Sequence, residues 1–174
     1  MTQITESGFR FTFPEGYEAV KFDDTSFYRR YFSFPGSKGL DIIACSAERI
    51  VLLEIKNCVR DIAGNRWRIA PDNQKVNTIS TQHEVHDRDS VDIEMIKKTA
   101  MTLACMVGAF TKKEGCPATE AIVPVYSALV DEKVCSYHRK VIVVLFLEGE
   151  FGSAVRPTSA ILRLLQTSMN NKLK

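Results

Sequence analysis

Apolar residues follow two different periods along the chain. They run almost without interruption through residues 40–46, 50–57 and 140–150, where Ile, Val and Leu dominate. Short runs of this kind, rich in β-branched residues, are typical of strands buried in a sheet. The segment FRFTF at residues 9–13 alternates apolar and polar side chains, which predicts one more short strand.

Three other segments have helical spacing. Residues 90–110 carry apolar side chains three or four positions apart, with Ser90 or Asp92 as N-cap and acids in the first turn. A last helix is predicted after Pro157, which suits a first helical turn. A short helix is predicted near residues 25–32, capped by Asp24 or Thr25. The apolar residues of these helices are Phe27, Tyr28, Tyr31, Phe32, Ile93, Ile96, Met101, Leu103, Ala104, Val107, Phe110, Ile161, Leu164, Leu165 and Met169.

Two segments have weaker patterns. Residues 58–90 are polar, apart from a short strand predicted at 66–70 around Trp67. Residues 121–130 predict a strand that Pro124 would push to a sheet edge. Strands therefore surround and separate helices, which predicts a mixed α/β fold with one central sheet covered on both faces, in a single domain over residues 1–174.

Composition indicates an ordinary globular protein of 174 residues, 45% hydrophobic and 25% charged. Its five cysteines include no C-x-x-C pair, so we expect neither a disulfide framework nor a structural zinc. The N-terminus has no signal-peptide pattern, and no apolar run reaches the roughly 18 residues of a membrane span. We therefore expect a cytoplasmic protein with no membrane partner.

The net charge is only +2, which is far from that of a protein that coats nucleic acid. Basic residues nevertheless gather after Glu150, where no further acid occurs, and between residues 56 and 75. Each group either meets phosphates or forms a solvated surface.

The charged residues in the two central strands predict a site. If residues 40–46 and 50–57 form a hairpin that turns at Ala47 and Glu48, the numbers of paired residues sum to 95. Asp41 then lies opposite Glu54, and Lys56 shares the face of Glu54. All three charges meet at one end of the hairpin.

Two opposed carboxylates repel each other, and burying them costs several kcal/mol without compensation. A divalent cation such as Mg²⁺ or Mn²⁺ compensates them, since Mg²⁺ commonly binds one or two protein carboxylates plus a substrate phosphate. A nearby lysine suits metal-assisted phosphodiester hydrolysis. The alternative is structural: Lys56 pairs with Glu54 or Asp41 where the sheet reaches water.

Leu40-Asp41, followed by RIVLLEIKN at residues 49–57, resembles the D…(D/E)-x-K signature of the PD-(D/E)XK nucleases, the restriction-endonuclease-like superfamily. The resemblance covers roughly residues 18–150 and implies an α-β-β-β-α-β core and a Mg²⁺-dependent nuclease acting on DNA. The polar segment and the IKKTAMTLACMVGAF helix are also similar to a small bacterial branch of that superfamily with no assigned role. Leu40 stands where the signature has proline.

The resemblance also implies residue roles. Asp41 and Glu54 would bind the metal ion together with the Ile55 carbonyl, and Lys56 would be the active-site lysine. A further acid from the early helix would be Glu18, with Asp23 and Asp24 as alternatives. Lys97 and Lys98 would contact the phosphates of nucleic acid or form a solvated helix face, and from the basic run Arg60 and Arg66 would contact nucleic acid.

Other readings remain open at this point. A catalytically silent member of the same fold would serve as a binding or assembly subunit, and a homodimer or larger complex would complete the DNA-binding surface. An unrelated α/β domain is a third reading. Weaker candidate sites are a metal site in the polar loop and a nucleophilic Cys45. The loop residues are His83, Glu84, His86 and Asp87.

Overall fold

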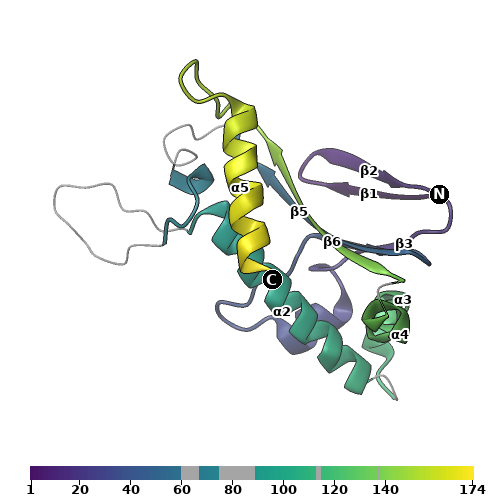
Figure 1. Ribbon diagram of the computed structural model, residues 1–174. Helices are drawn as coiled ribbons and strands as arrows, with labels where there is room; N and C mark the ends of the chain where they lie inside the picture. Colours follow the sequence, from purple (N-terminus) through teal and green to yellow (C-terminus); the bar gives the residue numbers. More distant parts are fainter. Residues whose placement is uncertain (60–66, 75–88, 113–114, 137) are drawn as a thin grey trace. The chain divides into compact units, whose positions relative to one another are not determined.

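The computed structural model describes residues 1–59, 67–74, 89–112, 115–136 and 138–174 (Figure 1). The chain divides into two compact units. The first unit comprises residues 1–55 and 98–146, and the second comprises residues 56–97 and 147–174. Because the units alternate along the chain, neither is a continuous segment, and the single domain over residues 1–174 stays a prediction.

A mixed four-stranded sheet has the strand order β3, β4, β5, β6. The strands are β3 (Glu18–Lys21), β4 (Ile42–Cys45), β5 (Arg49–Asn57) and β6 (Lys140–Glu148). β4 pairs antiparallel with both β3 and β5. β6 runs parallel to β5, because the Lys140 amide donates to Glu48 just before β5 and the Cys58 amide donates to Glu148 just after it. The predicted mixed α/β class is confirmed.

The register of the β4–β5 hairpin is the predicted one. Ile42 pairs with Leu53 and Cys45 pairs with Ile50, so paired numbers sum to 95. The Ser46 amide donates to the Arg49 carbonyl at 2.8 Å, which leaves Ala47 and Glu48 as the two turn residues. This register continues to the pair Asp41 and Glu54, one step beyond the end of β4.

Helices follow and interrupt the strands. The described helices are η1 (Tyr28–Phe32), α2 (Val91–Thr111), η2 (Pro117–Ile122), α3 (Val123–Val130), α4 (Glu132–Cys135) and α5 (Thr158–Lys172). α2, α5 and the short helical segment near residues 25–32 confirm the three predicted helices. On α5, Ile161, Leu165 and Met169 are buried as expected, but Leu164 is 45% exposed.

Two strand predictions are wrong. Residues 67–69 form a helical turn instead of the strand predicted at 66–70, and the third antiparallel strand is β3, earlier in the chain. Residues 121–130 form the end of η2 and helix α3, because Pro124 lies in the first turn of α3, where its missing N–H costs no hydrogen bond. β6 is half-buried along most of its length and not fully buried as predicted.

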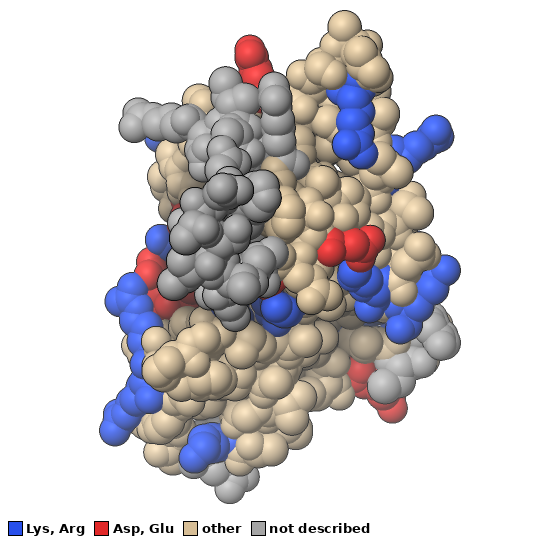
Figure 2. Space-filling view, turned by 90° about the vertical axis from the view of Figure 1, so that its left-hand side faces the viewer, with Lys and Arg blue, Asp and Glu red and all other residues tan. Residues whose placement is uncertain are grey.

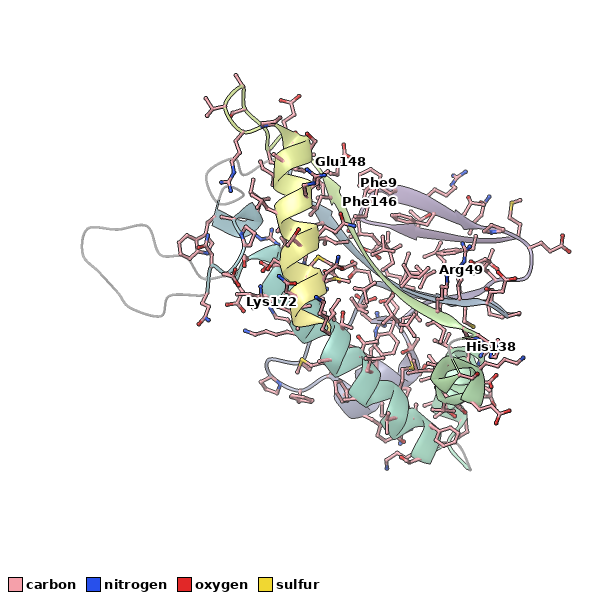
Figure 3. The ribbon with its side chains drawn as sticks, viewed as in Figure 1. Phe9, Arg49, His138, Phe146, Glu148 and Lys172 are labelled. Atoms are coloured by element: carbon pink, nitrogen blue, oxygen red, sulfur yellow. The ribbon has the colours of Figure 1, made fainter. Side chains whose placement is uncertain are left out.

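The N-terminal strands β1 (Thr2–Glu6) and β2 (Phe9–Phe13) form a separate antiparallel hairpin. Its apolar side chains cover one face of the sheet, packing on Ile42, Leu53 and Ile55 of the core. Phe9 lies edge-on against Phe146 of β6, with ring centroids 5.2 Å apart (Figure 3). On this face the predicted helical cover is therefore replaced by a β-hairpin, while α3 packs against β4.

Arg139 ties the start of β6 to its neighbours in the first unit. The residue is only 9% exposed, and its guanidinium donates to the carbonyls of Ala47 and Ala128 and to the carboxylate of Asp131. A buried guanidinium is stable only with its donors satisfied, so these bonds fix the hairpin turn against α3.

No described helix has the length and apolar character needed to cross a membrane.

Candidate active site

Asp41 stands where the chain enters β4. Its carbonyl accepts a hydrogen bond from the Phe22 amide at 2.9 Å, which extends the β3–β4 ladder by one step. Its side chain turns toward β5, where Oδ2 accepts the Ile55 amide at 2.7 Å. One carboxylate oxygen thus replaces a backbone carbonyl in the sheet, which fixes the orientation of the side chain.

Glu54 is the most deeply buried charged side chain of the hairpin, with 1% of the residue exposed. We refer to Asp41 and Glu54 as the carboxylate pair. The ammonium of Lys98, on α2, lies 2.6 Å from Glu54 Oε1, 2.7 Å from Glu54 Oε2 and 3.4 Å from Asp41 Oδ1. The predicted meeting of two carboxylates and a lysine therefore exists, but the lysine comes from the helix.

Lys98 is 15% exposed at its side chain. Burial alone would lower the pKa of its ammonium, but the charges of Glu54 and Asp41 and the hydrogen bonds to them outweigh burial and raise the pKa above its ordinary value. Lys98 is therefore positively charged at neutral pH. One positive charge faces two carboxylates.

The residues just before β4 are held by α2 on one side and by η1 on another. The Leu40 amide, next to Asp41, donates to Thr102 Oγ1 at 3.0 Å, and Thr102 lies one helical turn after Lys98 on the same helix face. Gly39 lies so close to the Tyr28 ring that a Cβ there would stand 2.9 Å from a ring carbon. Only glycine allows this approach without moving the ring.

Two other predicted lysines, Lys56 and Lys97, belong to the second unit. Lys56, two residues after Glu54 on β5, is 3.3 Å from Glu94 Oε2, and Arg68 is 3.2 Å from the same oxygen. Lys97 is 55% exposed at its side chain and pairs with Asp89. The structure therefore gives Lys56 an acidic partner of its own.

The additional acid near the carboxylate pair is a different residue from the one predicted first. Glu18 lies on β3 opposite Cys45. Cys45 is four residues after Asp41, so at strand spacing Glu18 lies roughly 13 Å from Asp41. Asp23 follows Phe22, which bonds to Asp41. Burial first, and then the charge of Asp41, raise the pKa of Asp23. The structure brings Asp23 near the site and leaves Glu18 away from it.

Asp41 and Glu54 offer carboxylate oxygens of the kind that Mg²⁺ prefers, and such an ion would keep several waters. Two facing carboxylates form the core of such a ligand set, and Oδ1 of Asp23 is buried without a hydrogen-bond partner among the described residues. No group of three or more His, Cys, Asp or Glu side chains suited to a metal occurs in the described part of the chain. Water and a substrate phosphate would have to complete the coordination.

Several predicted residues stay untested. Arg60 and Arg66 lie outside the described residues, as do the loop residues His83, Glu84, His86 and Asp87. Ile55 takes part through its amide, and the role of its carbonyl as a metal ligand stays a prediction. Burial raises the pKa of the Cys45 thiol, although the charge of Arg139 acts to lower it. The raised pKa keeps the thiol protonated and weakly nucleophilic.

Residues 25–174 match the model of a family of unknown function, DUF6661. The chain belongs to this family. The matched part contains Asp41, Glu54 and Lys98, whereas Asp23 and the strands β1 to β3 precede it. No curated protein and no solved structure matches the chain. The family description carries no activity, so the resemblance to PD-(D/E)XK nucleases stays a prediction.

Proposed function

We propose that the chain is a Mg²⁺- or Mn²⁺-dependent nuclease that hydrolyses phosphodiester bonds of DNA at the carboxylate pair. The observation that carries this proposal is the meeting of Asp41, Glu54 and Lys98 at one end of the hairpin, in the first unit. Two carboxylates that share a buried position need a cation, and a metal ion serves that need during phosphoryl chemistry.

The strand order supports the restriction-endonuclease-like core in this proposal. Three antiparallel strands, β3, β4 and β5, precede the long helix α2, and β6 then adds in parallel to β5. This order is similar to the β-β-β-α-β part of the expected core. Asp41 lies just before β4, and the E-x-K sequence, Glu54 to Lys56, lies on β5. The short helix η1 differs, since it lies between β3 and β4 instead of before the first strand.

Asp41 and Glu54 would hold the ion, which when bound makes a coordinated water more acidic and draws charge from the phosphate. The chain itself contributes a fixed arrangement. The Ile55 amide locks one oxygen of Asp41, so the other faces Lys98. In the hydrolysis the water oxygen forms a bond to phosphorus, the bridging P–O bond breaks, and the water proton ends on the released hydroxyl.

The charge distribution bears on the substrate. On the face drawn in Figure 2, Lys and Arg side chains stand in small groups that are separated by uncharged surface and by acidic patches. With a net charge of +2, such a surface provides few phosphate contacts, and non-specific DNA affinity depends on their number. We therefore propose that a homodimer or a complex subunit completes the DNA-binding surface. Cys45, Cys105 and Cys116 take part in no disulfide within the described part of the chain, which supports a reducing compartment such as the cytoplasm.

The test is cleavage of supercoiled plasmid, linear duplex, single-stranded DNA and RNA, with Mg²⁺, Mn²⁺ or EDTA. Wild type is compared with Glu54→Gln, and Glu48→Gln, in the turn of the same hairpin, is the matched control. The proposal predicts metal-dependent DNA cleavage by wild type and the control, lost in Glu54→Gln. Preference for RNA would correct the substrate, and equal cleavage by all three proteins would refute the site.

The ammonium of Lys98 also favours a second function. Lys98 already supplies a positive charge to both carboxylates, so the cluster is stable without metal. In a catalytically silent member of the fold, this ion pair would be permanent and the chain would act as a binding or assembly subunit. Such a protein would show no metal response and no cleavage with any substrate of the panel.

A further inference from the structure

Two lysines compete for the role of the ammonium at the carboxylate pair. The sequence pattern E-x-K selects Lys56, two residues after Glu54. In the structure Lys56 pairs with Glu94, 3.3 Å away, which it shares with Arg68. Lys98 instead stands within hydrogen-bond distance of Glu54 and within ion-pair distance of Asp41.

A buried contact on α2 supports the position of Lys98. Thr102, one turn further along α2, is fully buried and accepts the amide of Leu40, the residue before Asp41. That bond ties one face of α2 to the segment that carries the first carboxylate. Lys98 lies on the same face, and its side chain, 15% exposed, reaches the pair.

The ammonium of Lys98 faces both members of the carboxylate pair. Asp41 and Glu54 bring two negative charges, and Lys98 brings one positive charge. A single ammonium with three donors can serve both carboxylates and still turn one N–H toward an incoming phosphate oxygen. Lys98 is thus placed to face a phosphate oxygen that approaches the carboxylate pair.

We propose that Lys98, and not Lys56, is the lysine of the catalytic site, where its ammonium faces the phosphate oxygens that gain charge as the P–O bond breaks. This rests on the proposed nuclease function. Lys98 takes no proton in the reaction, and its contribution is a fixed positive charge in a buried site. Lys56 then serves the ion pair with Glu94.

The experiment compares Lys98→Met, Lys98→Arg, Lys56→Met and Lys56→Arg, with Lys133→Met as an exposed-lysine control, below the melting temperature of each variant. Two readouts are taken, the DNA cleavage rate and the shift of melting temperature on adding Mg²⁺ or Mn²⁺. We expect Lys98→Met to lower kcat at least 100-fold with little change in KM, whereas Lys56→Met and the control stay within about threefold of wild type.

The metal response separates catalysis from folding. Lys98→Met leaves the carboxylate pair without its ammonium, so its melting temperature falls without metal and rises with metal by at least as much as wild type. The arginine variants keep the charge and therefore the fold, but the planar guanidinium does not reproduce the ammonium geometry. We expect Lys98→Arg to lose at least tenfold in rate and Lys56→Arg to lose almost none.

The outcomes that overturn the inference are distinct from those that overturn the function. Loss of cleavage in both Lys56 variants, with activity kept in the Lys98 variants, would return the role to Lys56. A wild type without cleavage or metal response would overturn the nuclease proposal and this inference with it. A metal response that appears only after Lys98 is removed would do the same, with Lys98 as the permanent replacement of the ion.

Discussion

The carboxylate of Asp92 offers the sharpest stability prediction. It is fully buried in the second unit and accepts hydrogen bonds from the side chains of Ser90, Ser168 and Lys172 and from the Asp72 amide. Burial would raise the pKa of Asp92, but these donors outweigh it and hold the pKa at about 2, below its ordinary 3.8. The network joins the start of α2 to the end of α5.

The lowered pKa has a stability equivalent. Each pKa unit is worth about 1.4 kcal/mol, so the ionised carboxylate of Asp92 contributes roughly 2 kcal/mol to the free energy of unfolding. Because the folded pKa is depressed, this contribution is present above pH 3.8, the ordinary pKa, and is lost as the pH falls through about 2. Asp92→Asn removes the contribution and keeps the side-chain shape.

The assay is urea unfolding of wild type and Asp92→Asn from pH 7 to pH 2, followed by circular dichroism. We expect a difference in unfolding free energy of about 2 kcal/mol at pH 7, shrinking to well under 1 kcal/mol at pH 2. Asp72→Asn is the control, because the side chain of Asp72 is 73% exposed and its ion pair with Lys172 is worth little. Parallel pH profiles of wild type and Asp92→Asn would refute the reasoning.

Two more substitutions test the frame of the first unit. Arg139→Met should lower the free energy of unfolding by about 3 kcal/mol in urea denaturation, because it leaves buried carbonyls without donors. The control Arg163→Met, at an exposed position, should change it by less than about 0.5 kcal/mol. Equal effects of the two substitutions would contradict the role of Arg139. Gly39→Ala should lower the free energy of unfolding by about 1 to 3 kcal/mol, because its methyl group would meet the Tyr28 ring. Adding Tyr28→Leu to the same chain should recover part of that loss. Additive losses in the double variant would argue against the contact.

The β4–β5 hairpin could be predicted from sequence because its signals are local. Two apolar runs separated by a short polar turn fix the register once one face is buried, and the alternation then places Asp41 opposite Glu54. β3 was not predicted, because its EAVK sequence is short and carries little strand signal. Its place in the sheet is set by pairing with β4, which is a long-range contact.

In the segment at 121–130, local sequence signals predict a strand where the structure has a helix. Its β-branched residues favour a strand, and Pro124 within a strand favours a sheet edge. The same proline suits a first helical turn, and the buried positions Ile122, Val125 and Tyr126 have helical spacing, so that signal was available.

The sequence places Lys98 among the residues that contact nucleic acid, but it carries no signal for the position of Lys98 at the carboxylate pair. The resemblance to E-x-K nucleases favours Lys56, which is two residues from Glu54. Lys98 is 44 residues from Glu54, and only the packing of α2 against β4 through Thr102 brings it to the carboxylate pair. Charges that converge through tertiary contacts are beyond what one sequence predicts.

The most direct test of the account is the melting temperature of wild type as Mg²⁺ or Mn²⁺ is added, beside Glu54→Gln and the turn variant Glu48→Gln. A ligand that binds only the folded state at 100 times its Kd adds about 2.7 kcal/mol, or roughly 5 to 10 °C for a chain of this size. We predict such a rise in wild type and Glu48→Gln and its absence in Glu54→Gln. No rise in wild type, or the same rise in all three, would contradict a metal site at the carboxylate pair.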